Sequence, residues 1–128
     1  MSKDPARIVR DFMAAWKRKN VDELVAYFAP DAVYHNVPVA PHVGTVAIRA
    51  IFQGFCDMMD EGIELDVLNV AANGNVVMAE RIDRFRWQGK SLDLPVCGVF
   101  ELGDDGKIVK FRDYFNAPTW QDATGAPL

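Results

Sequence analysis

The sequence is short of the residues on which several large classes of enzyme depend. It has two cysteines and two histidines among 128 residues, and neither type falls in the spacing of a zinc or redox motif. No serine or cysteine stands with a histidine in a recognisable catalytic motif, so a covalent serine or cysteine hydrolase has no support. We therefore expect no metal site, and we expect Cys56 and Cys97 to be reduced and packed.

Excess positive charge and long apolar runs are also lacking. Fourteen Lys and Arg residues against eighteen Asp and Glu residues give a formal net charge of −4, and the sequence pI is about 5.0. Such a surface repels a phosphate backbone, which argues against nucleic acid as a partner. No apolar run approaches the ~20 residues of a membrane span, and no apolar signal segment follows the first residues. We expect a cytoplasmic protein with no membrane partner.

What is present is the composition of one globular domain. Half of the residues are hydrophobic and a quarter are charged, which is ordinary for such a domain. A chain of 128 residues can bury one core but is too short for two. Since no repeat or linker interrupts it, residues 1–128 are expected to form a single domain.

The first half of the chain predicts three helices. An apolar row at helical spacing marks the first: Ile8, Phe12 and Trp16. Asn20 is placed to cap a second, short helix that runs through Phe28 and is ended by Pro30. A third is predicted between Thr45 and Gly62, with this buried face: Ile48, Ile51, Phe52, Phe55 and Met59.

The second half predicts strands. Glycine-containing turns at 73–75, 88–90 and 103–106 separate extended segments at 64–71, 76–87, 91–102 and 107–115, and residues 32–37 form another short strand. Short hairpins make neighbours antiparallel. The predicted fold is α+β, with a curved, mostly antiparallel sheet that forms a cone, three N-terminal helices packed on it, and a deep pocket inside. The tail from residue 117 is expected to fray.

Polar residues interrupt the apolar faces of three predicted strands. Side chains two apart in a strand share a face, so Arg81 and Asp83 fall in the row that also holds Val77, Ala79, Phe85 and Trp87. Asp113 shares a face with Phe111, while Tyr34 and Asn36 share a face of the first strand. The pattern predicts one inward-facing polar cluster.

This cluster predicts acid–base chemistry, against a structural alternative. Buried charges must be paired or shift their pKa values. Arg81 can bond two carboxylates at once, which lets one stay ionised while the other holds a proton. A buried Asp–Arg–Asp triad can also be purely structural, and Tyr34 alone reads as a core aromatic. The joint occurrence of polar pairs on separate strands favours a functional site.

At these residues the sequence resembles the limonene-1,2-epoxide hydrolase family. This family belongs to the nuclear-transport-factor-2-like, or SnoaL-like, superfamily, together with polyketide cyclases and ketosteroid isomerases. The matching segments are Tyr-His-Asn at 34–36 followed by Pro38, Glu-Arg-Ile-Asp at 80–83, Gly-Val-Phe at 98–100 and Arg-Asp-Tyr-Phe at 112–115. They run in the family's order and span most of the chain.

The resemblance implies a cofactor-free epoxide hydrolase that forms a vicinal diol. It implies that Asp113 is the general base on a water held by Tyr34 and Asn36. It implies that Asp83, kept protonated, donates to the epoxide oxygen, and that Arg81 bridges the two carboxylates. The family also implies a homodimer.

An apolar pocket wall fits a small hydrophobic epoxide, cyclic and terpene- or steroid-like, with water as co-substrate. The expected wall residues are Phe85, Trp87, Val96, Phe111 and Val39. Alternatives on the same fold are a polyketide cyclase, a ketosteroid-isomerase-like enzyme and a non-catalytic ligand-binding module. The Tyr-x-Asn pair favours hydrolysis, because an isomerase has no water to position.

Overall fold

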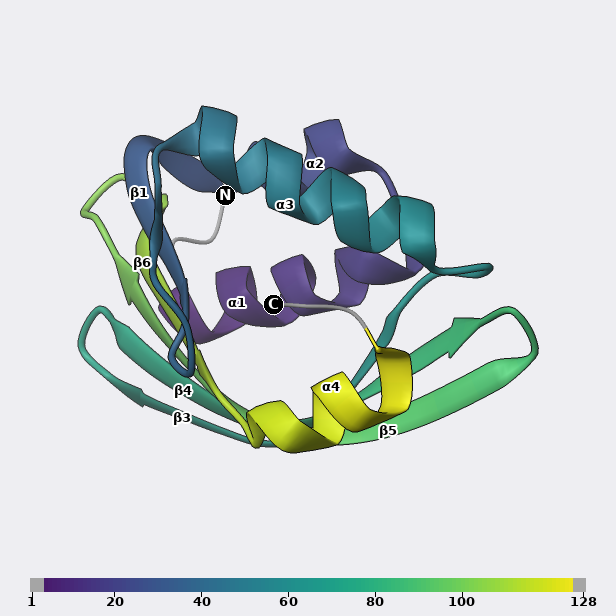
Figure 1. Ribbon diagram of the computed structural model, residues 1–128. Coiled ribbons are helices and arrows are strands. Elements are labelled where there is room, and N and C mark those ends of the chain that lie inside the picture. The colour runs from purple at the N-terminus through teal and green to yellow at the C-terminus, as the bar shows by residue number, and fades with distance from the viewer. Residues whose placement is uncertain (1–3, 126–128) are drawn as a thin grey trace.

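A six-stranded curved sheet organises the molecule, in a computed structural model that describes residues 4–125 (Figure 1). In chain order the elements are α1 (Pro5–Ala15), a 3-10 turn η1 (Trp16–Arg18), α2 (Val21–Val25), β1 (Phe28–Asn36), β2 (His42–Val43), α3 (Thr45–Met58), β3 (Glu64–Asn73), β4 (Val76–Trp87), β5 (Lys90–Leu102), β6 (Ile108–Tyr114) and α4 (Ala117–Thr124).

The strand order is β2-β1-β6-β5-β4-β3, and neighbouring strands are antiparallel except that β1 runs parallel to β6. The sheet curves like an open bowl, with α1 inside the curve, α2 and α3 above it, and α4 across the rim near β5 (Figure 1). The predicted α+β fold with a curved, mostly antiparallel sheet is confirmed, and the sheet is unclosed.

Local capping explains where the first helices begin. The Asp4 side chain accepts a hydrogen bond from the backbone N–H of Ala6, and Pro5 occupies the first turn of α1, where its missing N–H does no harm. The predicted cap at Asn20 is confirmed, since its Oδ1 accepts from the backbone N–H of Glu23 at 3.1 Å.

The predicted end of the second helix is wrong. The helix α2 ends at Val25, and Phe28 is instead the first residue of β1. Pro30 lies within that strand, where the pairing of β1 with β6 shifts register between Phe28 and Val33. Proline has no N–H to give to the hydrogen-bond ladder, so it is tolerated where the regular pairing is interrupted.

Two further predictions need correction. The helix α3 ends at Met58, and Gly62 has another role: a Cβ there would lie 1.9 Å from the backbone oxygen of Lys17, so only glycine permits this contact. The tail forms α4, capped by Asn116, because burial of Trp120 holds the segment against the domain. Fraying from residue 117 is therefore not seen in the described part of the tail.

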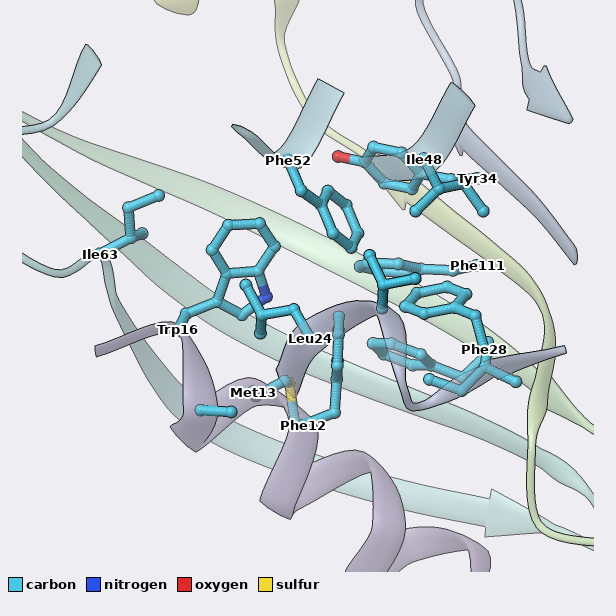
Figure 2. Packing of buried hydrophobic residues seen from close by; sticks show 14 of the residues in the cluster. Phe12, Met13, Trp16, Leu24, Phe28, Tyr34, Ile48, Phe52, Ile63 and Phe111 are labelled. Atoms are coloured by element: carbon cyan, nitrogen blue, oxygen red, sulfur yellow. The ribbon is translucent and has the colours of Figure 1, made fainter. Parts of the chain in front are cut away.

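Aromatic rings fill one part of the bowl. Phe12 packs against other rings at centroid distances of 5.4–6.4 Å, and the rings of Phe100 and Phe111 stack at 4.2 Å. Figure 2 shows Phe52 between Trp16 and Tyr34 at the edge of this cluster. Of the two free thiols, Cys56 is buried but Cys97 is exposed, so packing was predicted wrongly for Cys97, whose strand position faces outward.

Candidate active site

The register of the sheet brings the predicted polar residues together. Asn36 of β1 pairs with Asp113 of β6, which pairs with Gly98 of β5, which in turn pairs with Ala79 of β4. Arg81 lies two residues beyond Ala79 and therefore on the same face. Two small residues, glycine and alanine, thus stand in the row beside Asp113, and they leave room for the long arginine side chain.

Arg81 reaches both carboxylates. Its Nη1 and Nη2 donate to Oδ1 and Oδ2 of Asp113 at 2.9 and 2.6 Å, while Nε and Nη2 donate to Oδ1 and Oδ2 of Asp83 at 2.7 and 3.1 Å. The double contact expected from the sequence is present. A Cβ at residue 98 would lie 2.5 Å from Arg81 Nη1 and 2.8 Å from Asp113 Oδ1, so the triad needs glycine at Gly98.

These groups are removed from water. Arg81, Asp83, Asp113 and Asn36 are between 2% and 7% exposed, and they are the buried polar and charged residues of the part of the chain described. The guanidinium carbon of Arg81 lies 5.8 Å from the centroid of the Phe111 ring, which supports the charge on its apolar side. With all groups ionised, one arginine and two aspartates leave a net charge of about −1 in a low-dielectric site.

Burial and the neighbouring charges shift the pKa values of Asp83 and Arg81. Burial raises the pKa of Asp83 above its ordinary value; the nearby charge of Asp113 adds to the rise, and Arg81 offsets it only in part. Burial alone would lower the pKa of Arg81, but the charges of Asp113 and Asp83 raise it, so the guanidinium stays charged. Asp83 is thus a carboxyl suited to holding a proton.

Tyr34 and Asn36 form a hydrogen-bonded pair beside the triad. The Tyr34 hydroxyl donates to Asn36 Oδ1 at 3.0 Å. Burial, together with the charge of Asp113, raises the pKa of Tyr34, so its hydroxyl is neutral. A hydroxyl that donates one hydrogen bond can still accept another, and the Asn36 amide nitrogen supplies donors.

The five polar residues line one apolar cavity. It encloses about 520 Å³ of space between atoms, part of which is open solvent. The remaining lining is aliphatic and aromatic: Trp16, Phe55, Ile63, Leu65, Phe85, Leu94, Val96, Phe111, Phe115 and Trp120.

The chain that forms this cavity matches a known enzyme family over nearly its whole length. The family model for the limonene-1,2-epoxide hydrolase catalytic domain matches residues 3–124. The chain belongs to this family. It is 33% identical over 111 residues to the epoxide hydrolase EphG of Mycobacterium tuberculosis. The matched region covers 84% of this chain and 70% of that protein.

Solved structures agree with this family membership. A limonene-epoxide-hydrolase-like epoxide hydrolase of M. tuberculosis superposes with a TM-score of 0.79 at 28% identity, over 93% of this chain and 87% of that one. SalBIII, an epoxide hydrolase/cyclase-like enzyme of pyran-ring formation in the polyether salinomycin, superposes with a TM-score of 0.82 over 92% of this chain and 97% of that one. At 18% identity, the second likeness shows the shared fold alone.

Not every predicted wall residue of this epoxide-hydrolase-family cavity lines it. Phe85, Val96 and Phe111 do, but Trp87 and Val39 are absent from the lining found among residues 4–125. Trp87 is the last residue of β4, beyond Phe85, and the carbonyl of Val39 turns back to within 2.7 Å of His35 Nε2. The expectation that Trp87 and Val39 line the cavity is therefore wrong, because both lie away from it.

The sequence reasoning missed several lining residues. Leu94 could have been found by counting back from the turn at 88–89 to its position opposite Asp83. Leu65 lies opposite Asp83 only because the register of β3 shifts between Val67 and Asn69, which the sequence does not show. Trp120 was hidden in a segment predicted to fray, and its signal was the Asn-Ala-Pro start of a capped helix at 116–118.

Neither a metal-binding cluster nor a membrane-spanning helix is found in the described part of the chain. No group of three or more His, Cys, Asp or Glu side chains in residues 4–125 is placed to hold a metal ion. Of the helices described, none is both long enough and apolar enough to cross a bilayer.

Proposed function

We propose that this family member is an epoxide hydrolase that adds water in one step to a hydrophobic cyclic epoxide, forming a vicinal diol. The observation that carries the proposal is the buried clamp of Arg81 on two carboxylates within an apolar cavity. Two carboxylates in one site, one of them with a raised pKa, supply an acid and a base together.

Asp113 is proposed as the general base. It pairs with Asn36 across β1 and β6, so a water bound by Asn36 and Tyr34 would lie beside its carboxylate. Such a water can accept from the Asn36 amide and donate to the Tyr34 hydroxyl oxygen and to Asp113. One lone pair of the water oxygen then remains for attack on an epoxide carbon.

Asp83 is proposed as the general acid. As the water oxygen bonds to carbon, the carbon–oxygen bond of the ring breaks, Asp83 gives its proton to the ring oxygen, and Asp113 takes a proton from the water. Positioned acid and base groups each contribute about 10²–10⁴-fold. This route requires neither metal nor cofactor, because the strained ring supplies driving force and the substrate carries no charge.

The cavity wall supports an apolar substrate. Aromatic side chains from η1, α3, β4, β6 and α4, with aliphatic side chains between them, favour a ring system over a polar chain. We propose cyclic epoxides of terpene or steroid type as the substrate class.

The test is turnover of a panel of cyclic epoxides, with diol formation as the readout. The unmodified protein should form diols, whereas Asp113→Asn should retain the fold by circular dichroism and form none. If no epoxide is consumed while a β-polyketone or a ketosteroid is converted, the proposed hydrolysis is refuted in favour of a cyclase or an isomerase.

We also propose a homodimer through the convex face of the sheet. Leu68, Met78 and Tyr114 are 51%, 49% and 46% exposed, and the last two alternate with inward-facing residues of β4 and β6. Exposed apolar side chains on one face of a sheet are candidates for an interface. Light scattering should give twice the 14.3 kDa chain mass for the unmodified protein, and Met78→Lys should shift it to the monomer. Val46→Lys, on exposed α3 surface, should leave the mass unchanged; an unmodified monomer would refute the dimer.

A further inference from the structure

Trp120 carries a buried polar atom with no partner in the described structure. The residue is 3% exposed and lines the cavity, yet its indole Nε1 has no hydrogen-bond partner among residues 4–125. An indole nitrogen can only donate. A buried donor left unsatisfied costs about 1–3 kcal/mol, so a native protein rarely keeps one without reason.

The side chain of Trp120 is held firmly in place. Its ring packs edge-on against Phe85 at 5.1 Å and against Phe55 at 5.9 Å between centroids. The helix α4 is fixed at its start by the Asn116 cap, and at its end the Gly125 N–H donates to the Gln121 carbonyl at 2.8 Å. Packing therefore fixes the orientation of the Trp120 ring in the described structure.

The polar groups of the cavity are divided between two places. Arg81, Asp83 and Asp113 bond to one another, and Tyr34 bonds to Asn36, all from strands of the sheet. Trp120 reaches the cavity from α4, outside that network, with only apolar ring contacts recorded for it. The indole nitrogen itself has almost no surface accessible to water, so a ligand oxygen reaches it only when the surrounding side chains shift on binding.

We propose that the Trp120 indole N–H donates a hydrogen bond to an oxygen of the substrate remote from the epoxide ring. This inference rests on the proposed function and narrows it. The substrate class is then a cyclic epoxide bearing a second oxygen acceptor, such as a carbonyl or hydroxyl group, in preference to a pure hydrocarbon epoxide. A site with a buried donor rejects the analogue that leaves this donor unpaired.

The kinetic test compares two substrates of one ring skeleton. One is a monocyclic hydrocarbon epoxide, and the other carries a carbonyl group on a ring carbon away from the epoxide. The unmodified enzyme should favour the ketone by about fivefold to tenfold in kcat/KM, because the hydrocarbon leaves the buried donor unpaired. Trp120→Phe should reduce this ratio by the same factor.

Trp16→Phe is the matched control, because Trp16 is the other tryptophan of the cavity lining and its Nε1 is not left unpaired and buried. It should leave the substrate ratio unchanged. A ratio that stays the same in Trp120→Phe, or that falls equally in both variants, would overturn the proposal.

A binding measurement separates this inference from the epoxide chemistry. The chain has three tryptophans, so three indole N–H signals are expected by NMR, and single Trp→Phe variants assign them. Titration of the unmodified protein with an unreactive cyclic ketone of the same skeleton should move the Trp120 signal downfield, even if no epoxide is hydrolysed. If this signal stays in place while the ketone demonstrably binds, the N–H faces an aromatic ring instead and the inference is wrong.

Discussion

Gly98→Ala is expected to disable the site with a single added methyl group. The new Cβ would lie 2.5 Å from Arg81 Nη1, 2.8 Å from Asp113 Oδ1 and 3.2 Å from Phe100 Cε1. Ordinary contacts of a Cβ begin near 3.4 Å, so the guanidinium must move by about 1 Å. All three neighbours are themselves buried, which leaves them little room to yield.

Two effects set the size of the loss. Overpacking a filled core costs about 1–3 kcal/mol of unfolding free energy. Displacing Arg81 also lengthens its bonds to Asp113, and a misplacement of ~1 Å in a catalytic group can lower the rate about 10²-fold. We expect Gly98→Ala to unfold at lower urea concentration and to lose about two orders of magnitude in kcat.

Gly54→Ala is the matched control. Gly54 lies exposed in α3 with nothing within 4 Å of its virtual Cβ, so alanine there should stabilise the helix by up to ~1 kcal/mol and leave the rate unchanged. Urea unfolding and diol formation are measured on both variants. A Gly98→Ala protein with unmodified stability and rate would refute the packing of the triad described here.

Three further predictions concern the same cluster. Tyr34→Phe should lower kcat more than it raises KM, because the proposed role of the lost hydroxyl is to hold the attacking water and not the substrate. Steady-state kinetics decide this, and an unchanged kcat would mean that the hydroxyl only fills space. Arg81→Met should lower the free energy of unfolding by about 3–5 kcal/mol in urea, since it leaves two buried carboxylates without a counter-charge. This loss of stability should shrink at low pH, where carboxylates take up protons, and an equal loss at every pH would contradict the reasoning. Because burial raises the pKa of Asp83, its protonated form persists above the usual ~3.9. Both the acid function of Asp83 and its contribution to stability should therefore be present at low pH and decline as pH rises through the raised pKa. A ¹³C NMR titration, assigned with inactive Asp83→Asn, checks this, and an Asp83 that titrates at or below the ordinary value would exclude it as the acid.

The polar cluster could be predicted because strand geometry has a strict period of two. Arg81 and Asp83 must share a face wherever the strand lies, and the apolar neighbours show which face is buried. The hairpin turns indicate that β4, β5 and β6 are neighbours, but the register that brings Arg81 to Asp113 is seen only when the strands are paired. For the same reason the steric role of Gly98 emerges only once the strands are paired.

The errors come from local signals that distant contacts override. Pro30 resembles a helix stop, but it lies in a strand at a break in the ladder. Gly62 resembles a helix end, but its missing Cβ makes room for the Lys17 carbonyl, 45 positions away in the chain. The tail resembles a fraying segment, but burial of Trp120 against Phe85 and Phe55 secures it. Burial of this kind depends on the whole fold and leaves a weak trace in the sequence.

Direct attack by water is tested by a single turnover in water enriched in oxygen-18, with the enzyme in excess over a cyclic epoxide. If Asp113 activates a water held by Tyr34 and Asn36, the diol of that first turnover carries the heavy oxygen. Mass spectrometry of the peptides that contain Asp113 and Asp83 should then find no label. An unlabelled diol, with heavy oxygen entering one of these carboxylates on hydrolysis of an ester, would show that the protein itself attacks the epoxide and would contradict the role assigned to Asp113.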